Sequence, residues 1–431
     1  MKRYKPIDKQ LFIENRERFR KQMKTKSIAI FNSNEVMPRN GDASYDYKQN
    51  SDMYWLTGID QEDCAVVIFP DCPVETYREA LFIRRTNATI AVWEGHKYTK
   101  EEATAASGIK SVFWMDEFDT NTRAIILMAE TIYLTLNEND RNSNSFLTKD
   151  IAFVKQMKEK FPLHNFERAA PITQRLRSIK TPLEVEVMKK AIAISEKMFM
   201  RVLKFMKPGV TEYEVEAEVI HEFLRNGAAG HSFTPIVASG KNACVLHYID
   251  NAGVCSDGEL LLLDTGADYA NYASDMTRTF PVNGRFTKRQ KEVYNAVLRV
   301  MREAMKLLKP GVLLMQYHDE VCKIMEKELL DLKLLTPDDI KKQDPAWPAF
   351  KKYYMHGTSH FLGIDVHDVG MRYEHMKAGM TFSCEPGIYI PEEGIGIRLE
   401  DEILITENGC MDLMAHIPVE AEHIEELMNA K

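Results

Sequence analysis

The sequence has no long hydrophobic run. Its longest uninterrupted aliphatic stretch spans residues 260–263 (LLLL), and residues 1–10 contain no apolar run. A secretory signal needs an apolar region of about 7–15 residues, and a membrane-spanning helix needs about 20. We therefore expect neither export nor membrane insertion by these routes, and no membrane partner.

Cysteines are few, and their spacing forms no recognisable pattern. The chain has 7 cysteines in 431 residues, none of them in a CxxC pair. An odd number without that spacing favours reduced thiols over a disulfide framework or a thiolate zinc site. Together with the missing signal segment, this predicts a cytoplasmic protein.

Basic residues are fewer than acidic residues. The chain has 56 Lys and Arg against 64 Asp and Glu, a net charge of −8, and no basic stripe interleaved with aromatics. Nucleic acid is therefore not an expected partner. Hydrophobic residues at 45% and charged residues at 28% are ordinary for a soluble globular protein, which argues against disordered and collagen-like classes.

Two domains are predicted, because 431 residues exceed the about 100–200 of a single domain. The first third alternates a helix-compatible segment, residues 11–24, with short β-rich runs, as in an α/β domain. The boundary is expected near residue 170, which gives domains of residues 1–170 and 171–431. The β-rich runs are residues 27–31, 65–69, 80–83, 89–93 and 131–136.

The second part opens with strong helix signals. Thr181 and Thr211 each begin a capping box, with a glutamate three residues on, and Pro182 suits the first helical position. The sequence KPGV at residues 207–210 recurs at 309–312, each time between two helix-like segments. The repeat is either a chance similarity of helix ends or a sign of two related halves around a common centre.

Two aspartates flank a predicted hairpin. Asp264 directly follows the four leucines, and Asp275 precedes the strand-like residues 276–280. With a turn centred on residues 270–271, Asp264 faces Thr277 and Asp275 is its diagonal neighbour, so both carboxylates can converge. The alternative role, an aspartate that caps the turn, suits Asp268 better.

His356, His360 and His367 lie within twelve residues, although the whole chain has only 12 histidines. The zinc-protease pattern HExxH is absent, because the residue after His356 is Gly357. One metal ligand with two catalytic or supporting histidines is therefore favoured over three ligands. Each histidine alone would be read as an ordinary polar residue.

Two glutamates complete the candidate set. Glu385 precedes a Pro-Gly turn beside a β-rich run, and Glu400 alternates with Arg398 and Glu402 on one face of a predicted strand. Alone, Glu400 would be read as a charge facing water. Four converging carboxylates repel one another unless cations neutralise them. One histidine among oxygen ligands suits Mn²⁺, Co²⁺, Fe²⁺ or Zn²⁺.

These segments resemble the signature blocks of the aminopeptidase P family of pita-bread metallopeptidases. The matching blocks are LLLDTGADYANYASDMTRTFPVNGRF, MHGTSHFLGIDVHDVG, FSCEPGIYI and GIGIRLEDEILIT, and RNGDASYDYKQNSDMYWLTGI resembles the family's N-terminal domain. The resemblance covers nearly the whole chain. It implies an N-terminal creatinase/prolidase-like α/β domain and an α+β pita-bread catalytic domain, with two pseudo-symmetric halves around a curved antiparallel sheet.

The resemblance also implies a centre of two divalent metal ions, most often manganese. Asp264 would bind one ion, Asp275 and Glu400 would bridge both, and His360 and Glu385 would complete the second. Glu385 would also act as the general base that delivers a bridging hydroxide to the carbonyl before proline.

Other roles implied by the resemblance concern the substrate. His367 and His247 would bind the scissile carbonyl and the substrate, and His356 would line the proline-side pocket. Arg398 would orient a ligand carboxylate. Arg372 and Tyr389 are the remaining substrate-binding candidates.

The implied activity is release of the first residue from peptides that have proline second. The alternatives are a prolidase acting on Xaa-Pro dipeptides and a metal-free pita-bread binding module; methionine aminopeptidases lack such an N-terminal domain. The resemblance further implies a homodimer or homotetramer with its N-terminal domains packed together, in which Asp42, Tyr54 and Trp55 reach a neighbouring site.

Overall fold

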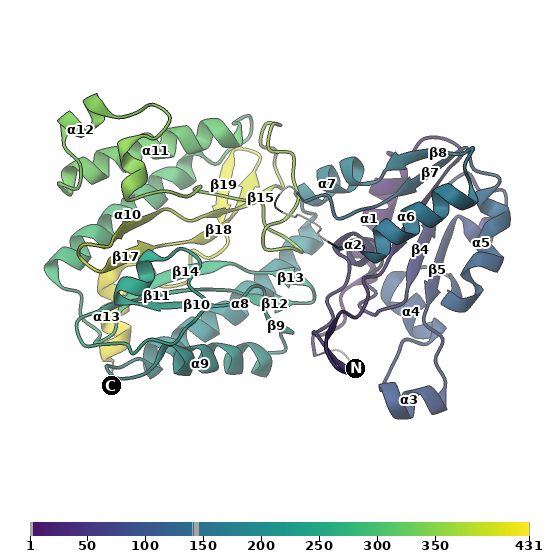
Figure 1. Cartoon of the computed structure of the whole chain (residues 1–431), viewed down its shortest axis with the longest axis horizontal. Helices are drawn as coiled ribbons and strands as arrows, with labels where there is room; N and C mark the ends of the chain where they lie inside the picture. Colours follow the sequence, from purple (N-terminus) through teal and green to yellow (C-terminus); the bar gives the residue numbers. More distant parts are fainter. Residues whose placement is uncertain (1–2, 140, 142–145, 431) are drawn as a thin grey trace. The chain divides into compact units, whose positions relative to one another are not determined.

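The computed structural model describes residues 3–139, 141 and 146–430, which form two compact units (Figure 1). Unit 1 spans Met1–Arg177 and unit 2 spans Ser178–Lys431. The division falls at the end of helix α7 (Ala170–Ser178), whereas the sequence placed it at the start of that helix. Within the described residues, no helix combines the length and the apolar character needed to cross a bilayer.

Unit 1 is built on a six-stranded mixed sheet with the order β6-β5-β4-β1-β7-β8. β1 pairs antiparallel with β4 and parallel with β7, so the sheet changes direction at its centre. The remaining strands of the unit, β2 and β3, form a small exposed hairpin. The strands are β1 (Ser27–Asn32), β2 (Pro38–Asn40), β3 (Ala43–Ser44), β4 (Ala65–Ile68), β5 (Glu79–Ile83), β6 (Ser111–Trp114), β7 (Thr131–Leu134) and β8 (Asn165–Arg168).

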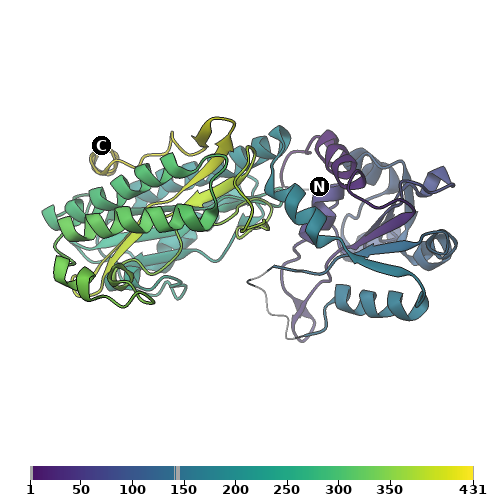
Figure 2. The same ribbon diagram turned by 90° about the horizontal axis from the view of Figure 1, so that it is seen from above.

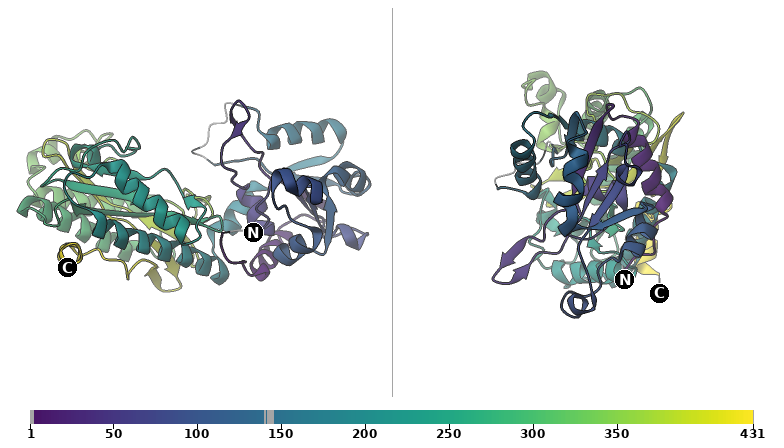
Figure 3. Two further views of the ribbon diagram at one scale, coloured as in Figure 1. Left: turned by 90° about the horizontal axis from the view of Figure 1, so that it is seen from below. Right: turned by 90° about the vertical axis from the view of Figure 1, so that its right-hand side faces the viewer.

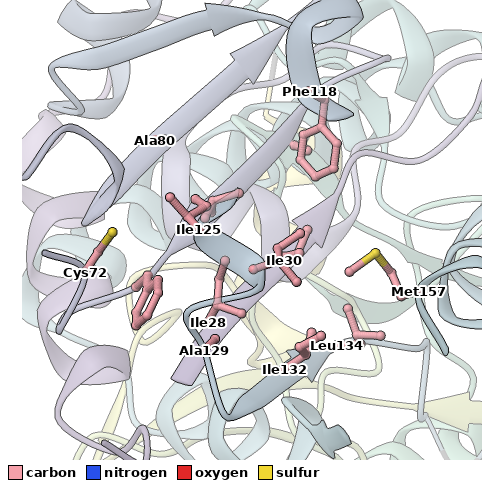
Figure 4. Packing of buried hydrophobic residues seen from close by; sticks show 14 of the residues in the cluster. Ile28, Ile30, Cys72, Ala80, Phe118, Ile125, Ala129, Ile132, Leu134 and Met157 are labelled. Atoms are coloured by element: carbon pink, nitrogen blue, oxygen red, sulfur yellow. The ribbon is translucent and has the colours of Figure 1, made fainter. Parts of the chain in front are cut away.

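Alternating side chains of β1 build two cores, one on each face of this sheet. Ile28 and Ile30 join Phe118 and other buried residues in the cluster of Figure 4. On the other face, the Phe31 ring lies 5.3 Å from that of Phe19. Helices therefore lie on both faces (Figure 3). They are α1 (Lys9–Arg20), α2 (Ser51–Thr57), α3 (Ala88–Glu94), α4 (Lys100–Ser107), α5 (Phe118–Ile126) and α6 (Lys149–Lys160), with short 3₁₀ turns η1 (Glu75–Tyr77) and η2 (Met115–Glu117).

The strand predicted at residues 89–93 is wrong, because this segment is the exposed helix α3. The Asn87 side chain accepts a hydrogen bond from the Ile90 amide, and Gly95, with φ of 74°, ends the helix. Val92 and Trp93 are 80% and 86% exposed, so no packing rewards an extended conformation here. The strand preference of these residues depends on such packing. In its absence, the helix caps at Asn87 and Gly95 favour the helix. The other four predicted runs overlap β1, β4, β5 and β7.

Unit 2 combines antiparallel strands with two long helix pairs. α10 packs on strands β15, β16 and β17, and Figure 2 shows the green helices α10 and α11 over the yellow strands. The helices are α8 (Pro182–Phe205), α9 (Glu212–Arg225), α10 (Lys288–Leu307), α11 (Leu314–Asp331), α12 (Pro337–Lys342) and α13 (Ala421–Asn429), with 3₁₀ turns η3 (Gly240–Cys244) and η4 (Ala349–Lys352).

The strands of unit 2 form small sheets with the orders β10-β11-β14, β13-β12-β9, β15-β18-β19 and β16-β17. They are β9 (Gly230–His231), β10 (Ile236–Ser239), β11 (Leu260–Thr265), β12 (Ala267–Tyr269), β13 (Tyr272–Ala273), β14 (Met276–Pro281), β15 (Thr381–Cys384), β16 (Gly387–Ile390), β17 (Ile395–Arg398), β18 (Asp401–Thr406) and β19 (Gly409–Asp412).

The repeated KPGV sequence marks equivalent turns of two halves. The first copy joins α8 to α9 and the second joins α10 to α11. Gly209 and Gly311 have φ of 92° and 85°, and their amides donate to Cys255 O at 2.9 Å and Met376 O at 3.0 Å. The shared pattern of backbone hydrogen bonds supports two related halves over chance similarity.

The two halves meet along β14 and the segment between β17 and β18. The Glu400 amide donates to the Thr277 carbonyl at 3.1 Å, and the Arg398 amide donates to Thr279 Oγ1 at 3.3 Å. Residues from both halves therefore converge at this junction.

Candidate metal centre

The first pair of acids lies on the hairpin that the sequence predicted. Asp264 pairs with Thr277 in the β11–β14 register. Ala270 and Asn271 have φ of 52° and 63°, which places the turn as expected. Asp275 lies just before β14, and its amide donates to Glu402 Oε1 at 2.9 Å. Both aspartates are buried, at 8% and 4% exposure.

His360 lies in an irregular segment, not on a helix, and its ring is oriented for binding through Nε2. Its Nδ1 lies 3.0 Å from the Phe361 carbonyl, which fixes Nδ1 as the protonated nitrogen. Its Nε2 lies 3.3 Å from Asp275 Oδ2 and 3.5 Å from Glu385 Oε1. Possible ligand atoms of Asp275, His360 and Glu400 lie within 4.8 Å of one another.

Glu385 and Glu400 come from the second half. The Glu385 amide donates to the Thr358 carbonyl at 2.9 Å, and its carboxylate accepts from Ser383 Oγ at 3.3 Å. Thr277 Oγ1 donates to Glu400 Oε2 at 2.6 Å. Glu400 is only 2% exposed, which excludes the alternative of a charge facing water and agrees with its expected place in the cluster. Arg398 and Glu402, which alternate with Glu400, are buried as well, so this segment has no face exposed to water.

Arg398 lies behind Asp264 and connects several groups of the site. Its Nη2 donates to Asp264 Oδ2 at 2.5 Å, and its Nη1 donates to the Tyr389 hydroxyl at 2.7 Å. The same hydroxyl lies 2.9 Å from His356 Nε2. Tyr389 is fully buried, and its hydroxyl contacts Arg398 and His356. Its role in substrate binding stays a prediction.

The electrostatics of the cluster are those of crowded buried acids. Burial raises the pKa of Asp275 to about 6, and the charge of Asp264 adds to the shift. Burial likewise raises the pKa of Glu385 to about 7, although the charges of His360 and Arg398 oppose this. The pKa of Glu400 is raised well above its ordinary value by burial and by the charges of Asp275 and Glu385.

The histidines differ from one another. Burial acts to lower the pKa of His360, but hydrogen bonding to Asp275 and the charge of Glu385 outweigh it and raise the pKa. Burial and the charge of Arg398 lower the pKa of His356 to about 3. His356 is therefore a neutral imidazole at physiological pH.

This donor set fits divalent cations. Ligand atoms of Asp275, His360 and Glu400 face a common point. Asp264 Oδ1 is buried and has no hydrogen-bond partner among the described residues. Buried carboxylates in mutual repulsion are stabilised when a cation takes up their charge. Oxygen ligands with one imidazole suit a hard or borderline divalent ion.

Of the other candidates, His367 contacts the cluster, whereas His247 and Arg372 are exposed. The His367 ring lies 4.4 Å from that of His360, in an edge-to-face arrangement. His247 is exposed on a loop after η3, and Arg372 is exposed on a turn. The expectation that Tyr54 and Trp55 reach a neighbouring site is wrong, because both are buried within unit 1, at 1% and 0% exposure.

Two supporting residues were not singled out from the sequence. Ser383 donates to Glu385 Oε1 and accepts from the His360 amide at 3.1 Å. Glu402 is fully buried and accepts from the Asp275 amide. A serine has no sequence signal for such a role. Glu402 had one, since period-2 alternation placed it on the face of Glu400.

A cluster of buried carboxylates with one imidazole, at the junction of two pseudo-symmetric halves, defines a pita-bread metalloenzyme. Comparisons with known proteins agree. Residues 186–407 match Metallopeptidase family M24, and residues 12–133 match the aminopeptidase P N-terminal domain. The chain belongs to metallopeptidase family M24 and carries the N-terminal domain typical of aminopeptidase P.

The chain is similar over nearly its full length to several relatives. It is 34% identical to the Xaa-Pro aminopeptidase of Haemophilus influenzae, with 98% of each chain covered. The structure of Pseudomonas aeruginosa aminopeptidase PepP superposes with a TM-score of 0.90 at 31% identity, with 99% of each chain covered. The chain is also 31% identical to the mouse Xaa-Pro dipeptidase, over 97% of this chain and 93% of the relative.

Proposed function

We propose that this chain is a Xaa-Pro aminopeptidase that releases the first residue from peptides with proline second, and that it uses two divalent ions. The observation that carries the proposal is the buried cluster around Asp275, His360 and Glu400. Full-length similarity to an aminopeptidase of this specificity supports the choice of substrate.

The ions would be held by the residues that converge at the junction of the two halves. When bound, such ions act as Lewis acids on the attacking water and the scissile carbonyl. We propose Mn²⁺ as the metal, with Co²⁺, Fe²⁺ and Zn²⁺ as competitors. The ligand set is Asp264, Asp275, His360, Glu385 and Glu400.

Glu385 is the proposed general base. Its carboxylate lies 3.5 Å from His360 Nε2 and 3.9 Å from His356 Nδ1, and a general base must lie within reach of the proton that it takes. It would take the proton of the attacking water and pass a proton to the departing proline nitrogen. Ser383, by donating to Glu385 Oε1, holds the carboxylate in place.

Imidazoles would bind the substrate around this base. His367 and His247 would donate to the scissile carbonyl oxygen as negative charge develops on it. His356, kept neutral, would line the proline-side pocket, with Arg372 beyond it. A proline amide has no N–H, so anchoring the free amine near Asp264 suits this substrate better than a backbone hydrogen bond.

The cellular setting is part of the same proposal. We place the enzyme in the cytoplasm, since none of the described helices can span a membrane and the cysteines are all free thiols. We also propose a homodimer or homotetramer. Size-exclusion chromatography with light scattering would report its mass directly.

The test compares Gly-Pro-Ala with Gly-Pro, each given to Mn²⁺-loaded protein. We expect release of glycine from the tripeptide, and a fall in kcat of about 10²–10⁴-fold in Glu385→Gln, the scale of a lost general base. Glu393→Gln, which removes the exposed carboxylate paired with Arg289 at 2.8 Å, is the control and should retain activity. Cleavage of the dipeptide alone would make the chain a prolidase, and cleavage of neither would refute the proposal.

A further inference from the structure

The histidine assigned to the substrate carbonyl lies on a segment with little regular structure. His247 is exposed and belongs to residues 240–253, here called the His247 loop, in which η3 is the only helical or strand element described. An irregular exposed loop does not by itself hold a side chain in one place. Other groups must therefore fix this loop if His247 is to meet a substrate.

One buried carboxylate contacts both ends and the middle of the His247 loop. Glu212, the first residue of α9, is fully buried. Its Oε1 accepts from the Ser239 amide at 2.7 Å, from Ser239 Oγ at 2.8 Å and from Asn242 Nδ2 at 3.0 Å. Its Oε2 accepts from the Tyr248 hydroxyl at 2.8 Å and from the Gly253 amide at 2.7 Å.

These contacts require an ionised carboxylate. Burial acts to raise the pKa of Glu212, but hydrogen bonds from Asn242 and Ser239 outweigh it, and the pKa is lowered. The start of α9 adds the favourable end of a helix dipole. A glutamine at this position would replace one carboxylate oxygen with an NH₂ group. The donors that face that oxygen would then have no acceptor.

The loop is continuous with the candidate metal centre. Leu246 and Tyr248, on either side of His247, pack against a buried cluster that contains Tyr389. The Tyr389 hydroxyl contacts both Arg398 and His356.

We propose that Glu212 is a positioning residue, whose carboxylate holds the His247 loop so that His247 meets the substrate carbonyl. The inference rests on the proposed function, because it assumes that His247 contacts a substrate. Glu212 acts through the loop and does not touch the reacting atoms.

The kinetic test is a double-mutant cycle of Glu212→Gln and His247→Ala, with Gly-Pro-Ala as substrate. In the wild-type background, Glu212→Gln should lower kcat/KM by about 10- to 100-fold, the scale of a misplaced catalytic group. In the His247→Ala background it should have almost no further effect, because the group it positions is already gone. Equal losses in both backgrounds would overturn the proposal.

The matched control is Glu214→Gln, which removes the same charge two residues along. Glu214 is exposed and accepts only from Thr211 of its capping box among the described contacts, at 2.7 Å and 2.8 Å. It should leave kcat/KM unchanged. If Glu212→Gln fails to fold, Tyr248→Phe serves instead, because it removes one of the five donors to Glu212. It should lower kcat/KM by a smaller factor, and this loss should also disappear in the His247→Ala background.

Amide hydrogen exchange tests the same idea without any activity. In Glu212→Gln, the Ser239 and Gly253 amides should exchange faster than in wild type, and in Glu214→Gln they should not. Unchanged exchange would overturn the inference even in an active enzyme. Faster exchange in a protein that cleaves no Xaa-Pro peptide would leave Glu212 as the anchor of the loop and refute the proposed function instead.

Discussion

Asp275, Glu385 and Glu400 come from three separate segments, and each is held by hydrogen bonds that aim its carboxylate inward. Thr277 donates to Glu400, Ser383 donates to Glu385, and the Asp275 amide is bound to Glu402. These contacts fix the backbone and one oxygen while like charges remain close. The residues are therefore preorganised for cations, at a cost in stability whenever no cation is bound.

The repulsion between these carboxylates predicts how the stability of the metal-free protein depends on pH. The pKa of Glu385, about 7, lies above its ordinary value of 4.5. Between pH 4.5 and about pH 7, Glu385 keeps its proton in the folded state and has lost it in the unfolded state. The free energy of unfolding therefore falls as the pH rises through this window. Since the side chain is 20% exposed, we expect on the order of 2–3 kcal/mol from this group.

Urea unfolding of chelator-treated wild type and Glu385→Gln, each at pH 5 and pH 8, measures this contribution. Wild type should lose that much more stability on going to pH 8 than the variant, which has no carboxyl group to titrate at this position. The same pH dependence in both proteins would contradict the raised pKa.

At the scale of elements, the hairpin that holds Asp264 and Asp275 depends on a close approach of two backbones. Gly266 follows β11, and a Cβ added there would lie 1.7 Å from the Ser274 carbonyl oxygen. Ser274 in turn immediately precedes Asp275. The spacing of the two aspartates is thus set by a position where only glycine fits.

Gly266→Ala should therefore destabilise the protein by at least about 1–3 kcal/mol, the usual cost of overpacking, and should weaken Mn²⁺ binding as the aspartates move apart. Gly230→Ala is the matched control, because a Cβ there meets nothing within 4 Å. Urea denaturation and calorimetric titration of Mn²⁺ measure the two effects. A variant with unchanged stability and metal affinity would show that the hairpin relaxes freely.

The elements also show where sequence patterns suffice. The turn at Ala270 and Asn271 gave the correct register of Asp264 with Thr277, because local turn chemistry determines hairpin pairing. The capping boxes at Thr181 and Thr211 correctly marked α8 and α9. Such features are local, and local signals are present in the sequence itself.

Sequence patterns could not predict features that depend on contacts between segments far apart in the chain. The burial of Glu400, together with Arg398 and Glu402, depends on elements far away in the sequence that pack on both faces of this segment, and periodicity cannot reveal such neighbours. The helix at residues 88–94 replaced a predicted strand because Val92 and Trp93 are exposed and gain no packing from an extended conformation. The five donors that meet at Glu212 are likewise brought together by the fold alone.

At the scale of the whole molecule, each unit has its own buried core, and the candidate ligands all lie in unit 2. Domains with separate cores can unfold in separate steps, so a single unfolding temperature need not describe this chain. Metal binding stabilises only the unit that binds it. An ion at 100 times its Kd contributes about 2.7 kcal/mol.

Removal of metal should therefore lower the unfolding temperature of unit 2 and leave that of unit 1 unchanged. Fluorescence can separate the units, because three of the 4 tryptophans lie in unit 1 and Trp55 among them is fully buried. Trp347, in unit 2, is 62% exposed and should report little. We expect EDTA to shift the calorimetric transition of Mn²⁺-loaded protein by several degrees, while the tryptophan transition stays in place. If the tryptophan transition shifts by the same amount, the units unfold as one cooperative body, and the stability of unit 1 is coupled to the metals of unit 2.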